Sequence, residues 1–292
     1  MKDLISISKL TKEEIFNLLS LAAELKKKYH KGEEYKPLRD KTVITSFPAN
    51  SLRTRISFEA GIFQLGANSV NMQIDLEGAE PIEDKIGYLN NWIDYLVIRY
   101  PKENLIEEAA KKAEFSVINA MSEESHPCEI LSDFMALSEM RKDIKNLKIV
   151  TIGAAGNISN TWFELASKLD LNLIQICPAG YEINKELFEK SKKGSRGEIK
   201  ITNNIKEGIK NADIVLTDGW PKVNDDRFLP YQITLDILKM ADKNCIVNPC
   251  PPFTRGNEIA DEIIKSRHFI GYRAKENLLH MQKAILASLS KN

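Results

Sequence analysis

The chain has 292 residues, of which 43% are hydrophobic and 28% charged, as in a folded globular protein rather than a disordered or fibrous one. Its 41 basic and 41 acidic side chains balance to a formal net charge of zero, which excludes the broad basic surface of a typical nucleic-acid or membrane-surface binder. Because this length exceeds what one hydrophobic core usually organises, we expect two domains.

The four cysteines indicate a reducing compartment. Cys128, Cys177, Cys245 and Cys250 form neither a CxxC pair nor a dense cluster, which argues against a disulfide framework or a zinc site. No run approaches the roughly 18 apolar residues needed to span a bilayer, and no targeting segment is recognisable at the start of the chain. We therefore expect a cytoplasmic protein.

The first part of the chain alternates predicted helices and strands. Apolar residues at helical spacing predict an opening helix over residues 11–28, which Thr11 and Glu14 would start with a capping box. The elements expected next are a strand at 42–47, a loop at 48–52, a helix at 55–65, strands at 95–100 and 115–119, and a helix at 130–140. A charged segment at 141–145 then indicates a domain boundary.

The second part of the chain has the pattern of a parallel doubly wound sheet. Strands separated by helical segments are predicted at 147–152, 173–177, 199–202, 214–217 and 245–248. A last amphipathic helix at 274–290 could pack back on the first domain. The expected α/β fold thus has two doubly wound parallel-sheet domains joined by interdomain helices. The first is residues 1–140 with the last helix, and the second is residues 141–273.

The segment Ser51-Leu52-Arg53-Thr54-Arg55 lies between a predicted strand and a predicted helix. Backbone N–H groups, hydroxyls and guanidinium groups converge there, at a helix N-terminus that already favours anions. The segment therefore predicts a phosphate site. The alternative is a turn that merely caps a helix, with both arginines facing solvent or acids.

Two further polar groups follow strands of the same domain. His126-Pro127-Cys128-Glu129 opens a helix after the third strand, and Arg99 ends the strand before it. A neutral imidazole could donate to a carbonyl oxygen and stabilise the oxyanion that develops there, and an arginine at a strand end can bind an anion bidentately. The alternatives are a structural histidine and an ordinary surface ion pair. We expect this turn and the phosphate segment to face one cavity.

These segments together resemble the aspartate/ornithine carbamoyltransferase superfamily, nearer to its ornithine type, over almost the whole chain. Residues 51–55 are similar to the family's Ser-Thr-Arg-Thr-Arg, and residues 126–129 to its His-Pro-Thr-Gln. Four later segments are also similar to family motifs. Residues 153–160 are similar to Gly-Asp-Gly-x-Asn-x-x-Asn, and residues 217–220 to Thr-Asp-x-Trp. Residues 248–251 are similar to His-Cys-Leu-Pro or His-Pro-Leu-Pro, and residues 276–280 to Glu-Asn-Arg-Leu-His.

The resemblance implies transfer of a carbamoyl group from carbamoyl phosphate to the amino group of ornithine or a related amino acid or amine, with release of phosphate and no cofactor or metal. It implies that carbamoyl phosphate is bound by Ser51, Leu52, Arg53, Thr54, Gln73, Arg99, His126 and Glu129. Among these, Thr54, Arg99 and His126 would be catalytic. The amino-acid substrate would be bound by Asn157, Asp218, Trp220, Cys250 and Pro251.

The resemblance also implies an assembly and a pathway. The expected form is a cytoplasmic homotrimer with shared active sites, in which Gln73 reaches a neighbouring subunit, and the expected role is arginine biosynthesis. Arg55 is expected to be structural, and the Cys250–Pro251 peptide bond is expected to be cis. Specificity for the acceptor would come from loops at 220–227 and 253–257.

Several residues depart from the family motifs. Leu52 stands where the family has threonine, Glu129 where it has glutamine, Asn248 where it has histidine, and Leu278 where it has arginine. The Ser-Met-Gly-Glu stretch of ornithine enzymes is missing after Trp220. An acid and a lost cation beside a phosphate predict weaker carbamoyl-phosphate binding or a different acceptor. They also leave open a catalytically impaired homologue with a binding, regulatory or scaffold role.

Two other chemistries are disfavoured. A nucleotide-dependent dehydrogenase would need Gly-x-Gly-x-x-Gly, whereas Gly153 and Gly156 give only Gly-x-x-Gly after a predicted strand. A thiol nucleophile at Cys128 would need a base and an orienting acid, and adjacent residues at a helix start normally point apart. We expect Cys128 to be a packing residue.

Overall fold

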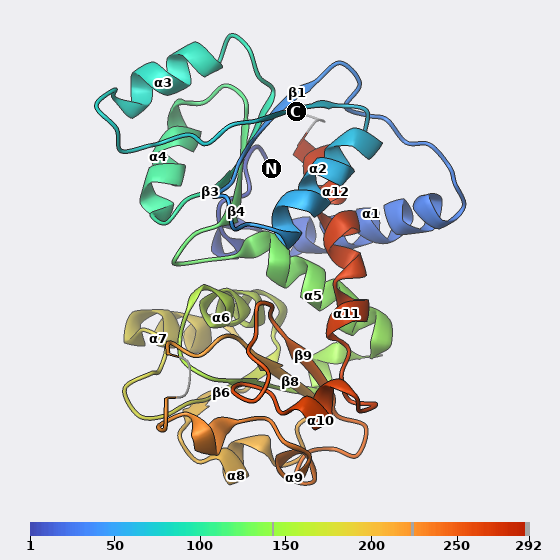
Figure 1. Cartoon of the computed structure of the whole chain (residues 1–292), viewed down its shortest axis with the longest axis vertical. Helices are drawn as coiled ribbons and strands as arrows, with labels where there is room; N and C mark the ends of the chain where they lie inside the picture. The colour runs from blue at the N-terminus through green and yellow to red at the C-terminus, as the bar shows by residue number, and fades with distance from the viewer. Residues whose placement is uncertain (142, 223–224, 290–292) are drawn as a thin grey trace. The chain divides into compact units, whose positions relative to one another are not determined.

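The computed structural model describes residues 1–141, 143–222 and 225–289 (Figure 1). The end of the last predicted helix at 290 and the middle of the loop at 220–227 lie outside the described residues. The chain forms two compact units, of which the first joins Met1–Ala136 to Lys275–Asn292 and the second is Leu137–Ala274. No described helix is both long and apolar enough to cross a lipid bilayer.

The first unit contains a parallel sheet with the strand order β2-β1-β3-β4. Its strands are β1 (Thr42–Ser46), β2 (Asn68–Asn71), β3 (Tyr95–Arg99) and β4 (Ser116–Met121). Its helices are η1 (Ile7–Lys9), α1 (Lys12–His30), α2 (Arg53–Gln64), α3 (Ile82–Leu89), α4 (Glu103–Lys112) and α12 (Glu276–Leu289), and α5 (Pro127–Met140) begins in this unit.

Both faces of this sheet are covered. In Figure 1, α3 and α4 lie on one side of the strands, while α1, α2 and α12 lie on the other. α12 packs against α1 and α2, and α3 packs against α4. Burial on both faces explains why β3 reads as the continuous apolar run that parallel strands typically show.

The second unit contains a parallel sheet with the order β7-β6-β5-β8-β9. Its strands are β5 (Lys148–Ile152), β6 (Asn172–Ile176), β7 (Ile199–Thr202), β8 (Ile214–Thr217) and β9 (Ile246–Pro249). Its helices are η2 (Ile144–Asn146), α6 (Asn157–Leu169), α7 (Lys185–Gly194), α8 (Ile205–Ile209), η3 (Leu229–Tyr231), α9 (Leu235–Leu238), α10 (Asp261–Ile264) and α11 (Gly271–Ala274). With two parallel α/β sheets, the predicted fold class is confirmed.

Each sheet has a point where the strand order reverses. From β1 the chain moves outward to β2 and returns on the other side with β3, and from β5 it moves outward to β6 and β7 and returns with β8. In open α/β sheets, ligands bind outside the carboxyl ends of the strands at such reversal points. The topology therefore predicts ligand sites at the loops after β1 and β3 in the first unit and after β5 and β8 in the second.

Candidate active site

The predicted phosphate segment lies at the carboxyl end of β1. β1 ends at Ser46, and α2 begins at Arg53 without a side-chain cap from Leu52. Thr54 and Ser51 are buried, and the Ser51 hydroxyl has no hydrogen-bond partner among the described residues. Leaving a buried hydroxyl unpaired costs roughly 1–3 kcal/mol. An uncapped helix N-terminus beside an unpaired hydroxyl is suited to receive the oxygens of an anion.

Arg99 ends β3, the strand beside β1, with Ile98 paired to Ser46. Burial, followed by the positive charge of Arg53, lowers the pKa of the half-buried Arg99 guanidinium. The two cations therefore lie near enough to repel each other at the sheet's reversal point. An anion between them would relieve that repulsion.

His126 lies at the start of α5, after β4, and is buried. Burial, aided by the charges of Arg99 and Lys275 and opposed by that of Glu129, lowers the pKa of His126 to about 4. The imidazole is therefore neutral near pH 7 and keeps an N–H donor. Arg99 thus interacts electrostatically with both Arg53 and His126.

A pocket of about 540 Å³ opens at the same edge of the sheet and is lined by Arg99 and Gln73. Pro48 and Asn50, which follow β1, and residues 121–123 at the end of β4 also line it. Ser51, Thr54 and His126 do not line this pocket. We call Arg53, Arg99 and His126, with the Ser51 hydroxyl, the anion cluster. Arg99 is the residue that this cluster shares with the pocket.

A buried three-residue ion cluster, which was not predicted from the sequence, adjoins His126. Glu129 and Asp133 lie one turn apart on α5 and are 4% and 2% exposed. Lys275, just before α12, donates through Nζ to a carboxylate oxygen of Glu129 and to Asp133 Oδ1, the latter at 3.0 Å. Burial alone would raise the pKa of the Glu129 carboxyl, but the charge and hydrogen bond of Lys275, with the charge of Arg53, outweigh it and hold the pKa below its usual range. Glu129 is therefore ionised, and its negative charge is paired with the Lys275 ammonium group.

Other residues of the first unit have mainly structural contacts. Arg55 Nε donates to Glu59 Oε1 at 2.9 Å, and the same oxygen accepts from Asn71 Nδ2 at 2.8 Å. Leu278 is buried at 2% exposure on α12. Cys128 is fully buried, and burial raises the pKa of its thiol, which does not suit a nucleophile.

In the second unit, candidate residues follow the strands beside the reversal point. Asn157 is the first residue of α6, which follows β5, and Asp218 directly follows β8. Asp218 lines a small hollow of about 20 Å³ together with Gly153 and Thr217. The Cys250 N–H donates to the Thr217 carbonyl at 2.7 Å, which holds the end of β9 beside β8.

Trp220 is anchored by its backbone. Its N–H donates to Glu258 Oε1 at 2.7 Å, and Glu258 Oε2 also accepts from the N–H of Thr254 at 2.7 Å. The Trp220 indole N–H is buried without a partner among the described residues, as is the side-chain amide of Asn248. Glu258 thus joins the two loops from which the sequence predicts acceptor specificity.

The predicted position of the cis peptide bond is wrong. The cis bond joins Pro251 to Pro252 rather than Cys250 to Pro251. Every bond before a proline is a tertiary amide with a reduced preference for trans, so the sequence Cys-Pro-Pro does not distinguish the two positions.

Comparisons with known proteins agree with this arrangement. Residues 2–139 match the model of the aspartate/ornithine carbamoyltransferase carbamoyl-P binding domain, and residues 145–289 match that of the Asp/Orn binding domain. The ornithine carbamoyltransferase of Caldicellulosiruptor saccharolyticus is 36% identical over 98% of this chain and 97% of its own, and that of Geobacter metallireducens is 34% identical over 98% of each. The solved ornithine carbamoyltransferase of Pyrococcus furiosus superposes with a TM-score of 0.94 at 29% identity, over 98% of this chain and 96% of that one. The chain therefore belongs to the aspartate/ornithine carbamoyltransferase family.

Proposed function

We propose that this protein transfers the carbamoyl group of carbamoyl phosphate to the side-chain amino group of ornithine and releases phosphate. The observation that carries the proposal is the anion cluster of the first unit. There, an uncapped helix start lies with Arg53, Arg99 and the neutral His126, and the buried Ser51 hydroxyl beside it has no partner in the described part of the chain. The relatives named above are ornithine carbamoyltransferases.

In the proposed mechanism, the phosphate is bound by Ser51, Arg53, Thr54 and Arg99. The carbonyl oxygen accepts hydrogen bonds from Thr54 and His126, so negative charge that develops on it meets preorganised donors. The neutral amine attacks the carbonyl carbon, and the tetrahedral intermediate collapses with loss of phosphate, which carries away the proton of the amine. Most of the acceleration comes from holding two reactants together and from stabilising the oxyanion.

Lys275 offsets the first of the two exchanges that raise most doubt about activity. The family's glutamine is replaced by Glu129, and the family's arginine by Leu278, so the site gains an anion and loses a cation. The Lys275 ammonium neutralises Glu129 directly. This contact favours an active enzyme over the catalytically impaired alternative, because the dianionic substrate would not meet an uncompensated carboxylate.

On the acceptor side, Asp218 would pair with an ammonium group and Asn157 would contact the α-carboxylate or α-amino group. An acid at the carboxyl end of β8 suits a cationic amino acid such as ornithine better than aspartate. Trp220, Cys250 and Pro251 would line the same site. The exchange of histidine for Asn248 leaves a related amine as the alternative acceptor.

The proposed assembly is a homotrimer in which Gln73 serves a neighbouring site. Gln73 is exposed and lies beside an apolar patch formed by Met72, Tyr88 and Trp92, which are 50%, 61% and 66% exposed. Exposed apolar patches commonly mark protein contacts. The proposed compartment is the cytoplasm, and production of citrulline from ornithine would place the reaction in arginine biosynthesis.

The reaction is tested by incubating the protein with labelled carbamoyl phosphate and a panel of acceptors: ornithine, lysine, putrescine, N-acetylornithine and aspartate. We expect labelled citrulline from ornithine, with a kcat/KM at least tenfold above that of any other acceptor. A labelled product from another amine in preference to ornithine would replace the acceptor. No labelled product from any amine would support the impaired homologue.

Replacement of Ser51 by alanine tests the phosphate site. Because the Ser51 hydroxyl is buried and finds no partner within residues 1–141, 143–222 and 225–289, we expect S51A to melt at the wild-type temperature or slightly above it. Loss of a hydrogen bond to a charged phosphate should cost about 1.5–3 kcal/mol, which raises the KM for carbamoyl phosphate roughly 10- to 100-fold. A drop in melting temperature with an unchanged KM would mean that Ser51 only packs.

A further inference from the structure

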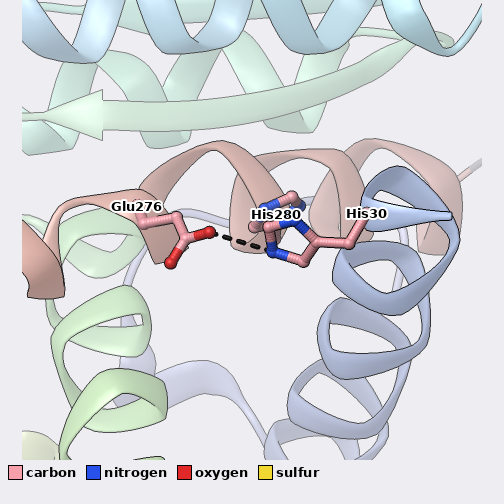
Figure 2. Close-up of side chains that lie close together, drawn as sticks. All are labelled: His30, Glu276 and His280. Atoms are coloured by element: carbon pink, nitrogen blue, oxygen red, sulfur yellow. Dashed lines mark ion pairs between the residues drawn. The ribbon is translucent and has the colours of Figure 1, made fainter. Parts of the chain in front are cut away.

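Three potential metal ligands lie together where α1 packs against α12, outside the anion cluster (Figure 2). His30 is the last residue of α1, whereas Glu276 and His280 are four residues apart on α12 and so project from one face of that helix. One donor atom from each side chain lies within 4.8 Å of the others. His30 Nε2 lies 3.0 Å from Glu276 Oε1.

His280 lacks a conventional explanation for its burial. Its side chain is 0% exposed, and neither ring nitrogen has a hydrogen-bond partner among the described residues. Buried polar groups are almost always paired, so such a side chain indicates a missing partner.

The neighbouring cations limit the strength of such a site but do not block it. Lys26 Nζ lies 3.3 Å from Glu276 Oε2 and donates to Asn277 Oδ1 at 2.7 Å, so it engages the carboxylate oxygen that faces away from His30. Lys283 Nζ donates to Gln64 Oε1 at 2.9 Å and lies over the Tyr29 ring. Neither lysine is therefore bound to Glu276 Oε1, and a donor atom of each imidazole lies within 4.8 Å of the carboxylate.

We propose that His30, Glu276 and His280 bind a divalent transition-metal ion such as Zn²⁺. Two imidazoles with one carboxylate favour Zn²⁺, Ni²⁺ or Co²⁺ over Mg²⁺ and Ca²⁺, which prefer oxygen ligands. The ion links the end of α1 to the first turn of α12. It takes no part in carbamoyl transfer, but Glu276 directly follows Lys275, so the ion also fixes the helix start next to the cation that neutralises Glu129.

The test uses the full chain, freed of metal by a chelator and then titrated with Zn²⁺ in the absence of substrate. We expect one Zn²⁺ per chain by calorimetry, and a rise in melting temperature of roughly 5 °C when the ion is in large excess over its dissociation constant. Mg²⁺ should give no shift. Because no substrate is present, the outcome is independent of the proposed activity.

The exposed ligands supply the decisive variants. His30→Gln and Glu276→Gln should abolish the rise in melting temperature, whereas Glu24→Gln, which removes an exposed acid from α1, should retain it in full. His280 is left intact, because replacing a fully buried side chain alters packing as well as the ligand set. Absence of Zn²⁺ binding by the wild-type chain, or a shift that persists in both ligand variants, would overturn the proposal.

Discussion

Replacing Lys275 by methionine is expected to destabilise the first unit by about 3–5 kcal/mol, because the change leaves the buried carboxylates of Glu129 and Asp133 without their shared cation. Chemical denaturation and thermal melting measure the loss. Carbamoyl transfer should fall as well, since an uncompensated Glu129 would repel the dianionic substrate. The effect is expected to be among the largest of any single substitution in this unit.

The pH dependence of the Lys275→Met variant follows from the same contacts. Without Lys275, burial, which is the largest influence on the Glu129 carboxyl, raises its pKa in the folded state above the unfolded value, so the folded state binds more protons than the unfolded one. The stability of the variant relative to the wild-type chain should therefore increase as the pH falls from 8 toward 5. The wild-type chain, in which the pKa of Glu129 is held low, should not gain stability in this way.

A double-mutant cycle separates the ion pair from simple packing. Glu129→Gln restores the family's residue, so Glu129→Gln in the Lys275→Met background should recover part of both stability and activity. Lys239→Met, which removes a solvent-exposed ion pair with Asp236, is the matched control and should leave both unchanged. If the second substitution recovers neither property, Lys275 acts by packing and does not compensate for Glu129.

The second unit shows how far a local pattern predicts a fold. Its buried strands are short apolar runs bounded by turn residues, and the ranges predicted at 199–202 and 214–217 coincide with β7 and β8. The strand β2 was missed because its sequence, Asn-Ser-Val-Asn, is polar and fully exposed. It joins β1 through backbone hydrogen bonds at the sheet edge, and such bonds leave no apolar signal in the sequence.

Some parts of the candidate site could likewise be predicted from the sequence, and others could not. Motifs carried by loops next to strands, such as Ser51 to Thr54 and the turn at His126, were predicted because a few residue types near one another in sequence define the chemistry. The contact of Lys275 with Glu129 was not, because it joins positions 146 residues apart and depends on how α12 packs. Glu129 therefore looked like a defect in the sequence and is a neutralised group in the fold.

Replacing His126 by glutamine is expected to lower kcat about 10²- to 10³-fold, the usual effect of removing one donor to a developing oxyanion. The KM for carbamoyl phosphate should change by less than about tenfold, because the phosphate is bound mainly by other residues. His268→Gln is the matched control: its ring Nδ1 lies 2.6 Å from the Cys245 carbonyl oxygen in the second unit, and kcat should be retained.

Stability gives an independent readout for His126. Its pKa is lowered from 6.5 to about 4 in the folded state, so below pH 6.5 the unfolded chain binds a proton that the folded chain does not. Wild-type stability should fall by about 1.4 kcal/mol per pH unit from this residue between pH 6.5 and 4, and His126→Gln should remove that contribution. If the variant keeps the wild-type pH dependence and a normal kcat, His126 is neither buried as a neutral ring nor a donor to the oxyanion, and the proposed mechanism fails at its central step.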